Sequence, residues 1–398
     1  METEERLHGL DAVRAFAMLG GILLHAMVSF VPGGLLGWPV VDVSTSVVLR
    51  EGFFVLHMCR MSLFFVMAGL FARLLYHRLG AIGFLRNRLK RIAAPLLVAM
   101  IIVLPLVIAA IVFGMRRMHV PPPVPPVRPL GIPVPFVHLW FLYLLCWFYA
   151  TLLLIKGAVK IVPGLEAGLG RVSDAITARA VRLHVAVPLL ALPLVVSQMR
   201  DRYWILFEGV PTPAVGLVPN TPALIAYGTA FAFGWLLHRQ IGLIDHWRRH
   251  WGVYLTTALV LTLAARLQLG LDPSFVLVPV SRIQRLAYAC CYSMALWCWT
   301  LGLIGLAQRY CAEPSPRVRY LADASYWMYL VHLPMVWGLA ALVAPWPLHW
   351  TVKFGFILLV SVPMLLASYR FIVRGTFIGA LLNGRRRPAR AEARNSAM

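Results

Sequence analysis

The chain alternates between long apolar runs and short polar segments. Most of the apolar runs are close to twenty residues long, which is the length at which a helix crosses the hydrocarbon core of a bilayer. This pattern predicts an all-α, polytopic membrane protein with about ten transmembrane helices in one bundle. The expected helices cover residues 11–31, 51–75, 93–114, 136–155, 184–199, 221–238, 251–268, 286–307, 321–344 and 350–371.

The composition excludes an ordinary soluble globular protein. Of the 398 residues, 60% are hydrophobic, and the mean hydropathy is +0.77. The first apolar run follows an acidic start and lacks a small-residue cleavage site, so we interpret it as a retained helix and not as a signal peptide. We expect residues 1–380 to form one transmembrane domain. Residues 381–398 should form a basic, disordered tail attracted to anionic membrane lipid.

A net charge of +22 can indicate a nucleic-acid partner, but the positions of the charges favour another explanation. Lysine and arginine gather between the apolar runs, which is a topology signal. Placing both termini in the cytoplasm assigns 25 of the 37 basic residues to cytoplasmic segments and nine to outer loops. We therefore expect both termini to be cytoplasmic, and we expect no nucleic-acid partner.

Two further compositional features bear on the loops and on redox chemistry. Residues 120–135 are rich in proline, which favours a stiff, extended lid or spacer on the outer side. The six cysteines form no Cys-x-x-Cys pair and mostly lie inside apolar runs. They are expected to be small core hydrophobes, so neither a disulfide framework nor a metal cofactor is predicted.

Arg14 and His25 are ionisable residues inside the first apolar run. Their eleven-residue separation is about 20° more than three helical turns, so both lie on one helix face, about 16 Å apart. Ionisable groups at membrane depth are costly and usually face a cavity or a partner. The pair therefore indicates a functional face, although a snorkelling arginine and a packed histidine are the alternative.

His57 and Arg60 are neighbours on one face of the second predicted helix. His25 lies six residues before the expected end of its helix, and His57 lies six residues after the expected start of the next. Both should then lie about 9 Å below the outer surface, where they could share a pocket. A structural pair of histidines is the alternative, but a buried Arg60 needs an anionic partner.

Two more histidines lie in later helices. His138 opens the fourth predicted helix from the outer side, and His332 lies near the middle of the ninth, two residues before Pro334. We take both as candidate substrate-binding residues. An interfacial histidine beside an aromatic belt and a packed, satisfied histidine are the alternatives.

A cluster of basic residues precedes the third predicted helix on the cytoplasmic side. Within it Arg88 and Arg91 are three residues apart, and Pro95 fixes the entry of the helix. Arginine binds phosphate in a bidentate manner, so the cluster suits a polyphosphate ligand. Arg14 should lie close to the same surface. The positive-inside tendency of loops is the alternative explanation for the charge.

The chain has no Walker loop, dinucleotide fingerprint, Gly-x-Ser-x-Gly elbow or His-Glu-x-x-His motif. Taken together in order, its motifs resemble the acyltransferase-3 family of membrane acyltransferases. The motifs that carry this resemblance are Asp11-Ala-Val-Arg14-Ala with His25, Phe64-Phe-Val-Met-Ala-Gly69, Arg88-Leu-Lys-Arg91-Ile-Ala-Ala-Pro95, His138-Leu-Trp-Phe-Leu and Ser325-Tyr-Trp-Met-Tyr-Leu-Val-His332.

The resemblance implies about ten helices in a bacterial inner membrane. It also implies transfer of an acyl group from cytoplasmic acyl-CoA to a hydroxyl of a periplasmic or cell-envelope glycan. His25 would lie at the reaction centre, with Arg14, Arg88 and Arg91 toward the donor. The segments around His57 and His138 are most similar to the glucan biosynthesis protein C subgroup, which is associated with succinylation of periplasmic glucans.

On this hypothesis His25 acts as a general base or as a nucleophile that forms an acyl-imidazole. His57 assists proton transfer, and Arg60 stabilises the oxyanion or pairs with a succinyl carboxylate. Acetyl and succinyl donors both remain open. The rival interpretation is a transporter or flippase for a glycan or lipid-linked precursor, without acyl transfer, and a membrane scaffold is a third.

Overall fold

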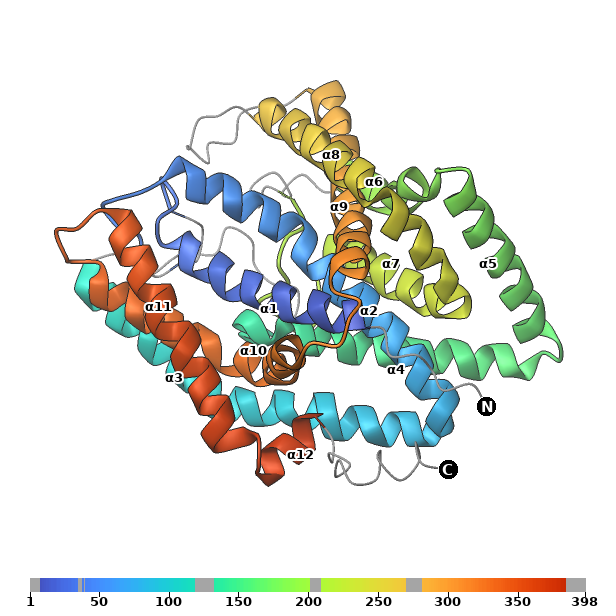
Figure 1. Ribbon diagram of the computed structural model, residues 1–398, viewed down its shortest axis with the longest axis horizontal. Coiled ribbons are helices and arrows are strands. Elements are labelled where there is room, and N and C mark those ends of the chain that lie inside the picture. The colour runs from blue at the N-terminus through green and yellow to red at the C-terminus, as the bar shows by residue number, and fades with distance from the viewer. Residues whose placement is uncertain are drawn as a thin grey trace.

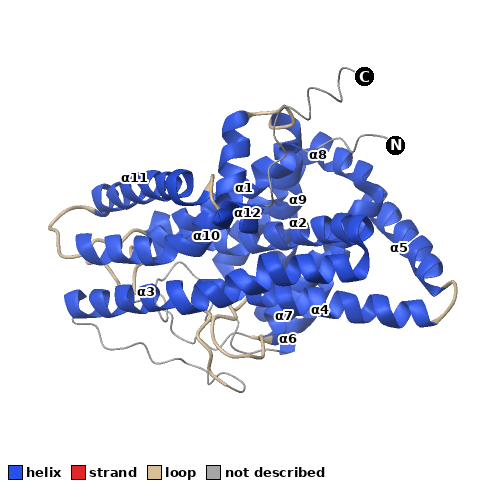
Figure 2. Ribbon diagram, turned by 90° about the horizontal axis from the view of Figure 1, so that it is seen from below, coloured by secondary structure: helices blue, strands red, loops and turns tan. Residues whose placement is uncertain are grey.

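The computed structural model describes residues 8–34, 38, 40–118, 132–200, 209–269 and 281–383, and within these ranges the chain is helical and without a strand (Figures 1 and 2). One isolated bridge joins Pro135 to Val215. The helices are α1 (His8–Val28), α2 (Val47–Arg88), α3 (Ala94–Met118), α4 (Trp140–Ile161), α5 (Leu165–Arg182), α6 (Ala186–Arg200), α7 (Thr221–Leu237), α8 (Ile244–Leu269), α9 (Arg282–Tyr310), α10 (Pro316–Val343), α11 (Trp350–Ser368) and α12 (Phe377–Asn383).

Each of the ten apolar runs coincides with a helix, which confirms the all-α membrane architecture. Two helices were not predicted. α5 lies in a stretch assigned to a cytoplasmic loop, and α12 crosses the expected start of the tail at residue 381. A search for long apolar runs misses α5 because its apolar residues alternate with charged ones. The rest of the tail and residues 120–131 of the proline-rich loop lie outside the described residues.

Among the described residues, six helical runs are long and apolar enough to cross a membrane, or seven if the bent pair α5–α6 counts as one span. The number is below ten because residues 47–117 count as a single run and α6, α7 and α8 are not included. At 71 residues that run is about 106 Å long as a helix, more than three times the hydrocarbon thickness. Gly80, at φ +70°, interrupts it inside α2.

α1 lies inside the bundle and packs against α2, α9, α10 and α11. A second close contact joins α2 to α7, where two glycines let the backbones touch. A Cβ on Gly69 would lie 1.9 Å from the carbonyl oxygen of Phe231, and one on Gly234 would lie 1.9 Å from that of Val66. Small residues permit this approach between membrane helices, which holds α2 in a fixed position beside α1.

Two of the six cysteines lie in the core. All six cysteines are free thiols; Cys59 and Cys298 are buried and the other four are half-buried. Among the described residues, no group of three or more histidine, cysteine, aspartate or glutamate side chains is arranged to hold a metal ion.

Candidate functional site

His25 and His332 form the centre of a buried cluster of histidines. His25 lies in the last turn of α1, and His332 lies in α10. Nδ1 of His25 is 2.7 Å from Nε2 of His332, and the two rings stack with centroids 4.9 Å apart. His332 is only 1% exposed. The packing of α1 against α10 therefore joins two imidazoles that are far apart in the chain.

The partners of His332 assign the protons in this pair. Its Nδ1 faces the carbonyl oxygens of Met328 and Tyr329 at 3.1 and 2.8 Å, and carbonyl oxygens only accept hydrogen bonds. Nδ1 of His332 must donate, so its Nε2 accepts from Nδ1–H of His25. In neutral His25 the lone pair then lies on Nε2. The arrangement presents Nε2 of His25 as a base.

His138 joins the cluster through a carbonyl that a proline leaves open. Pro334 has no N–H, so the carbonyl oxygen of Leu330, four residues earlier, lacks its helical donor. Nε2 of His138 donates to that oxygen at 3.0 Å. The ring centroids of His138 and His332 are 5.4 Å apart. Both candidate substrate-binding histidines are thus buried, and each donates to the backbone of α10.

Trp38, in the segment between α1 and α2, also packs against the ring of His25. The centroids of the two rings are 5.9 Å apart, and their planes are inclined by 29°. Nε1 of Trp38 donates to Oγ of Ser29 at 3.0 Å. Trp38 also packs edge-on against Trp337 of α10. Sequence reasoning missed Trp38 because nothing in the pattern of a connecting segment indicates which helix it covers.

A buried ion pair anchors the same segment to α11. Nζ of Lys353 lies 2.9 and 2.8 Å from the two carboxylate oxygens of Asp42 and 3.0 Å from the carbonyl oxygen of Ala344. The backbone N–H of Asp42 donates to the carbonyl oxygen of Ser29. A lysine in an apolar run requires such a partner. The pair therefore fixes the segment that carries Trp38.

His57 does not pair with His25 among the described residues. Its ring stacks on Phe53, one turn earlier in α2, with centroids 5.4 Å apart. The two helices end at other positions than expected, because α1 ends at Val28 and α2 begins at Val47. His25 is therefore three residues from its helix end, whereas His57 is ten residues from the start of α2.

Arg60 lies directly beside α1, one helical turn from His25. A Cβ on Gly21 would be only 2.6 Å from Nη1 of Arg60, so glycine is required for the guanidinium to lie there. Gly21 and His25 are four residues apart and share a helix face. Nε of Arg60 is buried and has no hydrogen-bond partner in the described part of the chain. This cation is thus available to an anion close to His25.

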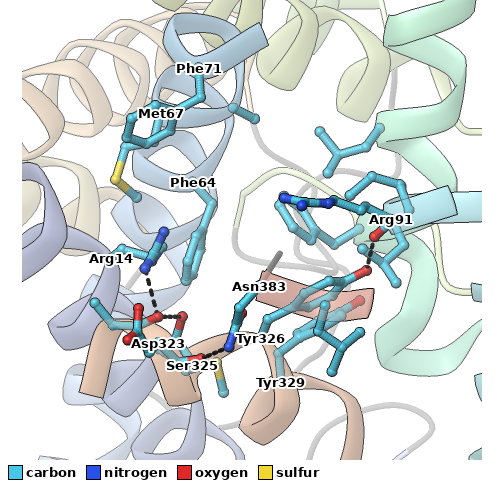
Figure 3. Close-up of a pocket in the computed structure, with 18 of the residues that line it drawn as sticks. Arg14, Phe64, Met67, Phe71, Arg91, Asp323, Ser325, Tyr326, Tyr329 and Asn383 are labelled. Atoms are coloured by element: carbon cyan, nitrogen blue, oxygen red, sulfur yellow. Dashed lines mark hydrogen bonds between the residues drawn. The ribbon is translucent and has the colours of Figure 1, made fainter. Parts of the chain in front are cut away.

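A cavity of about 550 Å³ connects Arg60 with the basic cluster. Figure 3 shows Arg14 and Arg91 on opposite walls, with aromatic rings between them. The arginines that line the cavity are Arg14, Arg60, Arg88, Arg91 and Arg319. Among the described residues, Asp323 is the only carboxylate in the lining, so the cavity favours an anionic ligand. None of the four histidines lines it.

The arginines are held in place by the cavity wall. Nη2 of Arg14 donates to the carbonyl oxygen of Ala322 at 2.8 Å. The guanidinium of Arg88 lies over the rings of Phe84 and Tyr149, at 5.6 and 5.4 Å from their centroids. Such stacking restricts a side chain that is otherwise flexible. The geometry brings the three predicted donor-side arginines into one cavity.

Sequence reasoning missed two residues of the cavity. Arg319, near the start of α10, adds a fifth guanidinium, and Asn383 ends α12. Nδ2 of Asn383 donates to the carbonyl oxygen of Asp323 at 2.8 Å, which holds α12 against the cavity mouth (Figure 3). Arg319 was counted only as a topological charge, because its position relative to Arg88 depends on how α10 packs.

Comparison with known families identifies the chain. Residues 7–368 match the acyltransferase-3 family, described as an acyltransferase domain. The match covers nearly the whole chain, so the chain belongs to this family and is a multi-pass membrane acyltransferase that transfers groups other than aminoacyl groups. No curated protein and no solved structure matches it in the corresponding comparisons.

Proposed function

We propose that the protein transfers an acyl group from acyl-CoA to a hydroxyl group of a cell-envelope glycan, in a bacterial inner membrane with both chain termini cytoplasmic. The observation that carries the proposal is the path from the arginine-lined cavity to Arg60, which lies one turn of α1 from His25. This proximity supports a site at which an anionic donor meets a histidine base.

The cavity is the proposed donor site. Acyl-CoA carries several phosphates, and Arg14, Arg88 and Arg91 offer guanidiniums to them from two walls. The cavity volume lies in the range of known small-molecule pockets. In this arrangement the phosphates stay at the cytoplasmic mouth and the thioester reaches inward to Arg60.

His25 is the proposed catalytic base. Its Nε2 takes the proton of the acceptor hydroxyl, and the oxygen attacks the thioester carbonyl carbon. The negative charge that develops on the carbonyl oxygen is stabilised by Arg60. Collapse of the intermediate breaks the C–S bond, and the proton passes from His25 to the departing thiolate. In the nucleophilic variant, Nε2 attacks the thioester carbonyl carbon first, and the C–S bond breaks to leave an acyl-imidazole and the CoA thiolate. The acceptor hydroxyl then displaces the imidazole from the acyl group, and its proton passes to the thiolate.

His332 is proposed to position His25 and not to touch substrate, since its two ring nitrogens already bind His25 and the α10 backbone. His138 holds α10 from the other side. His57 retains the proposed role of assisting proton transfer. A substrate contact by His332 requires one of these hydrogen bonds to break, whereas Nδ1 of His138 is buried and has no hydrogen-bond partner among the described residues.

The donor acyl group is acetyl or succinyl. Arg60 supports succinyl, because a buried guanidinium with an unpartnered Nε suits a terminal carboxylate. Succinyl transfer to a glucan would also agree with the similarity of the His57 and His138 segments to the glucan biosynthesis protein C subgroup.

The test is transfer of radiolabelled acyl groups by the full-length protein in proteoliposomes. The vesicles are inside-out and enclose periplasmic glycan. Acetyl-CoA or succinyl-CoA is added to the external solution, which faces the cytoplasmic side of the protein. We expect label on the glycan with one donor, and loss of label with His25→Ala at unchanged protein level. Translocation of unmodified glycan without any label transfer would support the flippase interpretation and refute the proposal.

A further inference from the structure

α5 forms one edge of the molecule and runs across the direction of α4 (Figures 1 and 2). It follows α4 after three residues and is bent by 108° from α6. The candidate span that contains α4 ends at Ile161. Since Leu165 follows so closely, α5 must begin near a membrane surface.

One face of α5 is fastened to the rest of the protein. Nε and Nη2 of Arg239 donate to the carboxylate of Asp174, each at 2.5 Å, and Gln240 donates to the carbonyl oxygen of Asp174. Glu166, at the start of α5, pairs with Lys156 of α4. Thr177 and Val181 are buried on this same side.

A second face of α5 carries an apolar stripe that the described protein leaves uncovered. Leu169, Val172 and Ile176 are 50%, 57% and 54% exposed. With Leu165 and Leu183, they recur at spacings of four, three, four and seven residues. At about 100° per residue, all five fall within about 60° of one another, away from Asp174. This face has no partner of its own among the described helices.

The basic residues of α5 gather along one flank of the stripe. Arg171, Arg179 and Arg182 are exposed and lie about 50–130° from the centre of the stripe, all on the same side. Among the described residues, no hydrogen bond or ion pair involves their side chains. An apolar stripe beside a basic flank is the pattern of a helix that lies in the membrane interface.

We propose that α5 is an interfacial helix whose apolar stripe inserts at the acyl boundary while its three arginines bind anionic lipid headgroups. The occupant is the lipid surface. The charge of the flank is complementary to an anionic leaflet, and the covalent link to α4 places the helix at that depth. The inference is independent of the proposed reaction, because none of its residues lines the cavity.

The test measures hydrogen–deuterium exchange of the full-length protein in nanodiscs. One set contains phosphatidylcholine alone, and the other contains phosphatidylcholine mixed with phosphatidylglycerol. We expect α5 peptides to exchange about tenfold more slowly in the anionic discs, with α9 peptides unchanged. The triple variant R171Q/R179Q/R182Q should remove that difference. The matched variant R249Q/R309Q/R317Q removes three exposed arginines elsewhere and should retain it.

A second variant separates insertion from simple charge attraction. V172S/I176S should speed exchange of α5 in both lipid compositions, because the stripe no longer inserts. Equal exchange of α5 in the two compositions would overturn the proposal. Protection that follows protein concentration and ignores lipid charge would also overturn it, and would indicate that a second copy of the chain covers the stripe.

Discussion

Nδ1 of His25 and Nε2 of His332 lie 2.7 Å apart, although 307 residues separate them in the chain. The hydrogen bond to His332 orients the imidazole of His25, and the backbone of α10 orients the imidazole of His332. Its consequence is that carbonyl groups on a different helix determine which nitrogen of neutral His25 carries the lone pair.

We expect His332→Ala to lower kcat by about 10²-fold with little change in the KM for the donor, because His25 loses the partner that fixes its ring. His332→Asn, whose amide can donate to His25 or accept from it, should recover part of the loss. Steady-state kinetics in proteoliposomes measures both variants. A rise in KM without a fall in kcat would mean that His332 binds substrate directly.

Gly21→Ala should displace the guanidinium of Arg60, since the new Cβ would be 2.6 Å from Nη1. We expect a loss of activity of about tenfold or more, with normal membrane insertion. The matched control is Gly20→Ala, where the nearest atom is 3.5 Å away, an ordinary contact. Equal activity of the two variants would show that the position of Arg60 does not matter for transfer.

Arg88→Gln should raise the KM for acyl-CoA by about tenfold, because a charge-assisted hydrogen bond to phosphate is lost. Arg319→Gln should act in the same direction if the fifth guanidinium also binds the donor. Arg86→Gln serves as the control, since Arg86 is exposed two residues away and does not line the cavity. The KM for acyl-CoA is measured for the three variants by donor titration. A similar rise in KM for Arg86→Gln would mean that general surface charge, and not the cavity, causes the effect.

Asp42→Asn should destabilise the protein by about 3–5 kcal/mol, because it leaves Lys353 buried without its carboxylate. Thermal unfolding in detergent measures the effect. Asp245→Asn, which removes the exposed pair with Arg248, should cost at most about 1 kcal/mol. If both substitutions shift the unfolding temperature equally, the pair of Asp42 and Lys353 does not anchor the segment that carries Trp38.

Acid should release α5 from the bundle. Hydrogen bonds from Arg239 lower the pKa of Asp174, and one from Lys156 lowers the pKa of Glu166. A lowered pKa in the folded state means that the pairs stabilise the attachment at neutral pH and lose that effect as the pH falls through the lowered values. Exchange of α5 peptides, corrected for the intrinsic rate, should therefore rise in acid. Asp174→Asn should reproduce the change at neutral pH, and release at alkaline pH would contradict this account.

Much of the architecture was predictable because it depends on local periodicity. The positions of ten helices followed from runs of apolar residues. The common face of Arg14 and His25 followed from the helical repeat alone. The basic segment of Arg88 and Arg91 followed from the spacing of charges along the chain. Helix ends were less predictable. α1 ends at Val28 and α2 begins at Val47, so the distances of His25 and His57 from their helix ends differ from the expected ones.

The sequence by itself determined which residues lie in the membrane and which of them are too polar to face lipid. Only the tertiary structure decided their partners: His332 for His25, Gly21 for Arg60, and Asp42 for Lys353. The physical reason is that a helical repeat orients side chains around one axis. Contacts between helices depend on the rotation and the register of two axes, which only the packing of the whole bundle sets.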